Sequence, residues 1–412
     1  MNQCRRVPII IAFCFSFTNL TAQLKLVEGK WRAVLVREDK NEVVFNMEIK
    51  GTGKNTQLTI NNATEKIKLI NFKQKGDSVF FEMPVFESTF KAKIGKDGSM
   101  NGEMAKGTTG KTQYWPFKAW PGQSYRFAVS KPAQYNISGR WELAITRPNK
   151  TIRPAMAEWI QKGNKVTGTI LTPSGDYRYL DGVVTGDSLF MSVFDGSHTY
   201  LFRALIKDNN SIADGFFYSG ISGVEEWKAK RNNNYSLPDV GNTPEMKAGY
   251  THLDFRFLDV DSVQVSITDE RFKNKVVSVQ LMGSWCPNCM DETKFLSEYY
   301  LKAKKEGVEI LAIAYENSTD FKRSQASVRK FQQRFNVKYP MLISGVSVTD
   351  SLRTEKTIPQ LTTIKVYPTT IYIGKDGTVR KLHTGFYGPG TGEHFEAFKK
   401  EFYQTIADLL KE

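Results

Sequence analysis

Two cysteines in the C-terminal part of the chain have the spacing of a redox pair. Cys286 and Cys289 are separated by two residues and follow a largely apolar segment, residues 276–282, that is typical of a buried strand. The pattern after them predicts an amphipathic helix that ends at Gly307. The order of strand, Cys-x-x-Cys and helix therefore places both thiols in the first turn of a helix.

A helix N-terminus favours the ionised form of a cysteine. Unpaired backbone N–H groups and the positive end of the helix dipole stabilise a thiolate there. In Cys-x-x-Cys motifs the cysteine pKa falls to roughly 3.5–7.5 from about 8.5. We expect Cys286, nearer to the helix end, to be the nucleophile, and Cys289, one turn later on the same face, to resolve a mixed disulfide.

Half of a structural zinc site is the alternative for this pair. Such a site needs about four ligands, but the other two cysteines, Cys4 and Cys14, both lie in the predicted leader. The histidines show no paired metal spacing; they are His198, His252, His383 and His394. We therefore expect neither a metal nor a cofactor.

The first 22 residues have the layout of a secretory signal peptide. Basic residues precede the apolar run Ile9–Phe17, which is too short to span a bilayer, and cleavage is expected after Ala22. Lipid attachment at Cys14 is the less favoured alternative, because the bulky Phe13 precedes it. No later stretch reaches 18 apolar residues, so we expect export to a bacterial periplasm without a transmembrane helix in the mature chain.

The formal net charge of +14 raises the question of a nucleic acid partner. Most of the excess lies in residues 23–239, which hold 31 basic and 22 acidic side chains. The aromatic residues there alternate as core positions and do not interleave with Lys and Arg along one strand. We interpret the charge as a solvated face and expect no nucleic acid partner.

The region before residue 232 contains an internal duplication with an offset of 110 residues. Gly29-Lys30-Trp31 recurs as Gly139-Arg140-Trp141, and Gly76-Asp77-Ser78 recurs as Gly186-Asp187-Ser188. Each copy holds short alternating runs of β-branched and aromatic residues separated by turn residues. About eight strands in ninety residues suit a small up-and-down barrel, since a barrel leaves no exposed sheet edge.

We therefore predict two tandem antiparallel β-barrels, residues 23–120 and 137–232. The Gly-x-Trp at the first strand and the repeat size resemble the lipocalin and fatty-acid-binding superfamily. Barrels of eight strands either fill with side chains or hold one small ligand. Filled barrels acting as spacers or docking surfaces are favoured over barrels that enclose an apolar ligand, and the sequence does not decide between them.

Beyond a polar linker, residues 233–249, the chain resembles the thioredoxin fold over residues 250–412. The resemblance is to the exported thiol-disulfide oxidoreductases of the TlpA and ResA type. Trp285-Cys286-Pro287-Asn288-Cys289 matches their active-site motif. Tyr367-Pro368-Thr369-Thr370 matches the Pro-Thr-Thr that begins a later strand. The predicted fold class is thus two barrels followed by an α/β thioredoxin-like domain.

This resemblance implies further site residues. Pro368 is expected to be a cis-proline beside the cysteines, and it is expected to bind substrate together with Trp285, Pro287 and Tyr367. Thioredoxins often place an aspartate six residues before the first cysteine, where this chain has Gln280.

Another group must then accept a proton from Cys289. Glu316 aligns with a segment that contributes an active-site glutamate in the ResA type, and we take it as the candidate base. Glu292 is expected to support the helix end. Residues 317–335 are expected to form a solvated amphipathic helix and not a binding patch.

The sequence thus favours an exported thiol-disulfide oxidoreductase, and more specifically a reductase of protein disulfides that takes electrons from an upstream thiol donor. The alternative is a lipid- or peptide-binding protein that uses the barrels, with the thioredoxin domain as a docking scaffold. A scaffold has no need of the complete Trp-Cys-x-x-Cys and Pro-Thr-Thr set, which places this alternative second.

Overall fold

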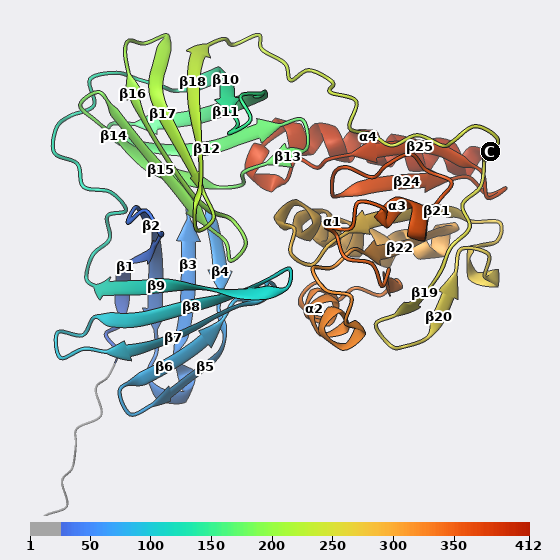
Figure 1. Ribbon diagram of the computed structural model, residues 1–412, viewed down its shortest axis with the longest axis horizontal. Coiled ribbons are helices and arrows are strands. Elements are labelled where there is room, and N and C mark those ends of the chain that lie inside the picture. The colour runs from blue at the N-terminus through green and yellow to red at the C-terminus, as the bar shows by residue number, and fades with distance from the viewer. Residues whose placement is uncertain (1–25) are drawn as a thin grey trace, which may run out of the picture.

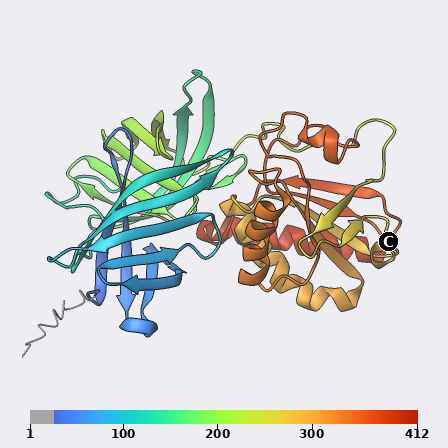
Figure 2. The same cartoon turned by 60° about the horizontal axis from the view of Figure 1, so that its bottom comes forward.

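The computed structural model describes residues 26–412, so the predicted signal peptide, residues 1–22, lies outside the described residues. Two β-barrels lie on one side and a domain of mixed helices and strands on the other (Figure 1). The view turned by 60° keeps the same arrangement (Figure 2), so the two parts are neighbours in space.

The first barrel is one antiparallel sheet of nine strands. Their order is β4-β3-β2-β1-β9-β8-β7-β6-β5. Leu69, the single residue between the edge strands β4 and β5, donates its N–H to the carbonyl of Leu58 in β3 (2.9 Å), so β5 begins beside β3 and the barrel is nearly closed. The strands are β1 (Gly29–Val36), β2 (Glu42–Lys50), β3 (Gln57–Asn62), β4 (Glu65–Lys68), β5 (Ile70–Lys75), β6 (Ser78–Glu82), β7 (Ser88–Ile94), β8 (Met100–Thr108) and β9 (Lys111–Pro121).

The second barrel repeats this plan and closes completely. Its strand order is β11-β10-β18-β17-β16-β15-β14-β12-β13, and β11 also pairs with β12. The predicted pair of tandem barrels is confirmed. The strands are β10 (Gly139–Thr146), β11 (Ile152–Lys162), β12 (Lys165–Thr172), β13 (Gly175–Asp176), β14 (Leu180–Thr185), β15 (Ser188–Phe194), β16 (Thr199–Ile206), β17 (Ser211–Ser219) and β18 (Gly223–Arg231).

The repeated Gly-x-Trp has the same structural role in both barrels. Gly29 and Gly139 begin the first strands with φ of 116° and 113°, values that L side chains rarely adopt. The indole N–H of Trp31 donates to the carbonyl of residue 27 (2.9 Å), and that of Trp141 donates to residue 137 (2.9 Å). Each tryptophan is thus buried in the core of its barrel with its indole donor satisfied.

Aromatic side chains pack against one another in the core of both barrels. The ring centroids of Phe81 and Phe90 are 4.7 Å apart in the first, and those of Phe202 and Phe217 are 4.3 Å apart in the second.

The barrels also pack on each other. The buried Arg126 donates to the carbonyls of Ser192 (2.9 Å) and Asn61 (2.6 Å), which lie in different barrels.

The C-terminal domain is built on a sheet of seven strands with the order β20-β19-β23-β22-β21-β24-β25. The central strands β21, β22 and β23 are parallel, β24 runs antiparallel to β21, and β25 runs antiparallel to β24. The strands are β19 (Arg256–Asp259), β20 (Gln264–Ser266), β21 (Val276–Met282), β22 (Val308–Ala314), β23 (Met341–Ile343), β24 (Thr369–Ile373) and β25 (Val379–Thr384).

Both faces of this sheet are covered, so every residue of its central strands β21 and β22 is buried and most of them are apolar. Successive residues of β21 enter different cores: Val276 packs with α1, α2 and α4, and Val277 packs on the opposite face. The helices are α1 (Pro287–Ala303), α2 (Phe321–Arg334), α3 (Arg353–Thr357) and α4 (Glu393–Lys411). Within residues 26–412, no helix combines the length and the apolar composition needed to cross a bilayer.

Candidate active site

Cys286 lies at the junction between the central strand β21 and helix α1. It is the N-cap residue of α1, with extended backbone (φ −99°, ψ 114°), and Pro287 follows at the first helical position. The backbone N–H of Cys289 donates to the sulfur of Cys286 at 3.2 Å. The predicted order of strand, Cys-x-x-Cys and helix is therefore present, and the sulfur of Cys286 takes the place of a capping oxygen.

The two cysteines form a disulfide, with their Cα atoms 5.2 Å apart. Cys286 is 4% exposed and Cys289 is fully buried, so Cys286 is the sulfur nearer to the surface. Among the described residues, no group of three Cys, His, Asp or Glu side chains is arranged to hold a metal ion.

The segment that leads into β24 lies beside the disulfide. The peptide bond between Tyr367 and Pro368 is cis, as the resemblance implied. The carbonyl oxygen of Tyr367 lies 3.6 Å from the sulfur of Cys286. The Tyr367 ring meets that of Trp285 edge-on at 5.9 Å, and the indole N–H of Trp285 donates to the carbonyl of Tyr315 (2.8 Å). Trp285, Tyr367 and Pro368 are thus gathered around Cys286.

Glu292 does not support the helix end, contrary to our expectation. It is buried within the domain, where it accepts hydrogen bonds from Gln280 (2.7 Å) and Thr370 (2.7 Å). The same Gln280 nitrogen lies 3.5 Å from the carbonyl of Cys289. Burial raises the pKa of Glu292 to about 7, and the two hydrogen bonds oppose this shift. Glu292 lies three residues after Cys289 and so on the same helix face, a spacing that could have identified it from the sequence.

Glu316 is also buried, but it faces a different part of the site. Its carboxylate accepts the backbone N–H of Ser284 (2.8 Å) and its hydroxyl (2.6 Å). Burial raises the pKa of Glu316 to about 7, and Glu87 adds to the shift while Ser284 and Arg323 oppose it. The hydrogen bonds of Glu316 thus hold the backbone two residues before Cys286 and do not go to a sulfur.

Comparison with known proteins agrees with this geometry. Residues 247–396 match the Redoxin family. Over 137 residues the chain is 31% identical to the thiol-disulfide oxidoreductase ResA of Geobacillus thermodenitrificans, covering 33% of this chain and 69% of the relative. The chain belongs to the ResA-type thiol-disulfide oxidoreductases. ResA of Bacillus cereus is 28% identical over 202 residues, covering 49% of this chain and 95% of the relative.

Solved structures of similar proteins cover the same share of the chain. A thiol-disulfide oxidoreductase from Bacteroides fragilis is 18% identical with a TM-score of 0.28, covering 37% of this chain and 99% of its own. A thiol:disulfide interchange protein of the thioredoxin family from Chlorobium tepidum is 18% identical with a TM-score of 0.29, covering 40% and 99%.

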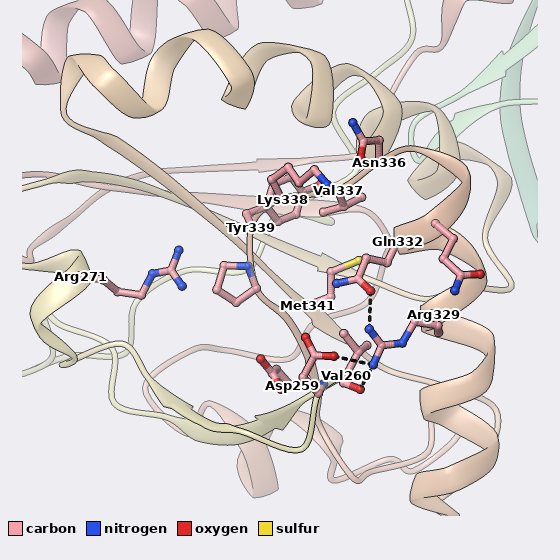
Figure 3. A pocket seen from close by; sticks show the side chains of 13 residues that line it. Asp259, Val260, Arg271, Arg329, Gln332, Asn336, Val337, Lys338, Tyr339 and Met341 are labelled. Carbon is pink, nitrogen blue, oxygen red and sulfur yellow. Dashed lines mark hydrogen bonds and ion pairs between the residues drawn. The ribbon is translucent and has the colours of Figure 1, made fainter.

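A hollow of about 550 Å³ lies away from the cysteines of this ResA-type enzyme, between β19, α2 and β23. Figure 3 shows that Arg329 is held there by its neighbours. Its guanidinium binds Asp261 (2.7 Å), Gln332 (2.6 Å) and the carbonyl of Val260. These contacts satisfy the guanidinium of Arg329.

The burial of Glu292 predicts how the stability of the enzyme depends on pH. The folded pKa of about 7 exceeds the ordinary value of 4.5, so folding favours the protonated carboxyl. This contribution is complete below pH 4.5 and is lost as the pH rises through 7. Glu292→Gln is expected to reduce the fall in free energy of unfolding between pH 5 and pH 8 by about 2 kcal/mol.

Denaturant titrations at the two pH values measure this effect. Glu298→Gln is the matched control, because Glu298 lies on the same helix and is exposed. An equal pH dependence in Glu292→Gln and in the unaltered enzyme would contradict the assignment of a raised pKa to this carboxyl.

Proposed function

We propose that this ResA-type enzyme is exported to the periplasm and reduces disulfide bonds in protein substrates, with an upstream thiol donor restoring its dithiol. The observation that carries the proposal is the position of Cys286, whose sulfur caps α1 and accepts the N–H of Cys289 at 3.2 Å. A helix N-terminus stabilises the thiolate that disulfide exchange requires. The secretory layout of residues 1–22 supports export.

The reaction is an exchange of two electrons between two sulfur pairs. The Cys286 thiolate attacks one sulfur of the substrate disulfide, that bond breaks, and the departing substrate thiolate takes up a proton. Cys289 then loses its proton and attacks Cys286. The mixed disulfide breaks, the second substrate thiol leaves, and the Cys286–Cys289 disulfide remains. The substrate is reduced by two electrons and the enzyme is oxidised by two.

Four residues around Cys286 are proposed to hold the substrate. Trp285 and Pro287 flank the nucleophile in sequence, and Tyr367 and Pro368 approach it from the segment just before β24. The carbonyl of Tyr367, 3.6 Å from the sulfur, provides backbone with which an extended substrate segment can pair. Side chains of the substrate then meet the rings of Trp285 and Tyr367, which are 5.9 Å apart.

Two buried carboxyl groups are candidates for the base that takes the proton from Cys289. Glu316 was assigned from the sequence, and its contacts favour a role in holding Ser284 and the backbone that leads to Cys286. Glu292 lies one turn after Cys289 and is joined to it through Gln280. A pKa of about 7 suits either carboxyl for proton exchange near neutral pH.

Cysteine substitutions test the proposed steps. Cys286→Ser is expected to abolish insulin reduction, because the nucleophile is lost. Cys289→Ser is expected to accumulate a mixed disulfide with the substrate, because the resolving thiol is lost. Mass spectrometry under non-reducing conditions detects that adduct. Equal insulin reduction by Cys286→Ser and the unaltered enzyme would contradict the mechanism.

The reduction potential of the cysteine pair tests the direction of electron flow. A reductase is expected to have a potential below about −200 mV, on a scale where thioredoxin lies near about −270 mV and the oxidant DsbA near about −120 mV. Redox titration against glutathione or dithiothreitol measures it. A value close to that of DsbA would assign the enzyme to disulfide formation.

The pH dependence of thiol exchange distinguishes the two carboxyl groups. Substitution of the base by Gln is expected to remove the inflection near pH 7 and to slow the resolving step by about 10²-fold or more. Substitution of the other carboxyl is expected to leave the inflection in place. The rate of thiol release is compared for Glu292→Gln, Glu316→Gln and the control Glu298→Gln. An unchanged profile in Glu316→Gln would end its assignment as the base.

A further inference from the structure

Four turns of the two barrels converge on the active-site face of the C-terminal domain. From the first barrel they are the β6–β7 turn, residues 83–87, and the β8–β9 turn, residues 109–110. From the second barrel they are residues 172–179 around β13 and residues 195–198 between β15 and β16. Both views place β13 and the β8–β9 hairpin against the C-terminal domain (Figures 1 and 2).

The turn around β13 lies on the start of helix α1 and on the loop after β25. The backbone N–H of Gly388 donates to Asp176 (2.7 Å), and the hydroxyl of Tyr387 donates to the carbonyl of Thr172 (3.0 Å). A Cβ added to Gly175 would come within 2.1 Å of the side chain of Asn288. Asn288 is one of the two residues between the cysteines, so this turn covers the Cys-x-x-Cys motif itself.

The turn between β15 and β16 reaches the residue before the nucleophile. The hydroxyl of Ser197 donates to the carbonyl of Trp285 at 2.7 Å. On the other side, Lys106 of β8 donates to the carbonyl of Ser197. The backbone carbonyl of Trp285, next to Cys286, therefore already accepts a hydrogen bond from the second barrel.

A buried ionic cluster joins this closed arrangement across all three folding units. Arg178 of the second barrel binds Glu65 of the first barrel, Asp291 of α1 and Asp195 of its own barrel, the last at 3.2 Å. The carboxylates hold the pKa of Arg178 well above its ordinary value, so the guanidinium stays charged. Charges are seldom buried without partners, so the cluster selects one docked position of the barrels.

The first barrel completes the cover. Phe86 is buried in the same hydrophobic cluster as Cys286 and Cys289. Next to it, Glu87 accepts hydrogen bonds from Arg323 (2.7 Å) and Ser327 (2.6 Å) on α2. The expectation that this helix has only a solvated role was wrong, because one of its faces docks on the barrel.

We infer that the two barrels form a lid that closes the dithiol site against protein disulfides, and that exchange with a protein requires the barrels to move away from the thioredoxin-like domain. This inference rests on the proposed function, since it concerns regulation of the same site. The lid covers the carbonyl of Trp285, the side chain of Asn288 and the loop at Tyr387, all of which surround Cys286.

The chain has the connection that such a movement needs. Residues 232–244, between the end of β18 and the point where the N–H of Glu245 donates to Thr362 of the C-terminal domain (2.8 Å), contain neither helix nor strand. A segment of this length spans tens of ångströms when extended, at about 3.3 Å per residue. The barrels themselves are joined by the buried Arg126 and are expected to move as one body.

Two full-length variants test the lid. Glu87→Lys places a cation against Arg323, and Ser197→Trp adds bulk at the carbonyl of Trp285. Neither residue belongs to the proposed catalytic or substrate-binding set. Ser222→Trp is the control for bulk, because Ser222 is exposed in another turn of the same barrel. The double variant Glu87→Lys/Arg323→Glu restores the ion pair with reversed charges and is expected to close the lid again.

Activity is measured as the rate of reduction of insulin and of a small aromatic disulfide. Access to the reduced cysteines is measured as their rate of alkylation by iodoacetamide and by a maleimide that carries a 5 kDa polymer. The radius of gyration is measured by X-ray scattering. Both opened variants are expected to enlarge the radius and to reduce insulin and bind the bulky maleimide about tenfold faster, as expected for loss of about 1.4 kcal/mol of closure. Rates with the small reagents are expected to stay unchanged.

The outcomes separate the lid from the proposed function. If the unaltered enzyme reduces insulin and binds the bulky maleimide as fast as both variants do, the lid inference is wrong and the proposed function stands. If neither the enzyme nor its variants reduce insulin or the small disulfide, the proposed function itself fails. Recovery of slow insulin reduction in the charge-reversed double variant supports the lid.

Discussion

The junction between β21 and α1 is the constraint on which the rest of this enzyme depends. A strand buried on both faces delivers the chain to the edge of the sheet, and the helix begins at once with Cys286 as its cap. The sulfur therefore meets the N–H of Cys289 and the positive end of the helix. Because the strand is buried along its whole length and Cys286 itself caps the helix, the position of the thiol is built into the fold.

Around this junction the molecule collects buried polar groups that an inert scaffold would avoid. Glu292 and Glu316 have different partners near the cysteines, and burial raises the pKa of both to about 7. Each is satisfied by specific donors, Gln280 and Thr370 for the first and Ser284 for the second. Groups that exchange protons near neutral pH suit a reaction in which thiols and thiolates alternate.

The two barrels contact the thioredoxin-like domain around its redox site. Their cores are packed with aromatic rings, which agrees with a mechanical role, and their turns carry the contacts to the redox site. The ion pairs of Arg178 indicate that the contact between the barrels and the thioredoxin-like domain is specific and not adventitious. It is buried together with Glu65, Asp195 and Asp291, and these partners come from three folding units.

The resemblance to the TlpA and ResA type was needed for the thioredoxin-like domain and for the cis bond before Pro368. Local patterns in the sequence were sufficient for the barrels and for the Cys286–Cys289 pair, because strand alternation, the Gly-x-Trp repeat and Cys-x-x-Cys are all short-range signals. They misplaced Glu292, whose partner Thr370 lies 78 residues away, and they left α2 solvated although Glu87 docks on it. Units separated by 100 to 250 residues come into contact and bury one another only when the chain folds. Only the tertiary structure therefore decided which carboxyl groups are buried and that the barrels cover the redox site.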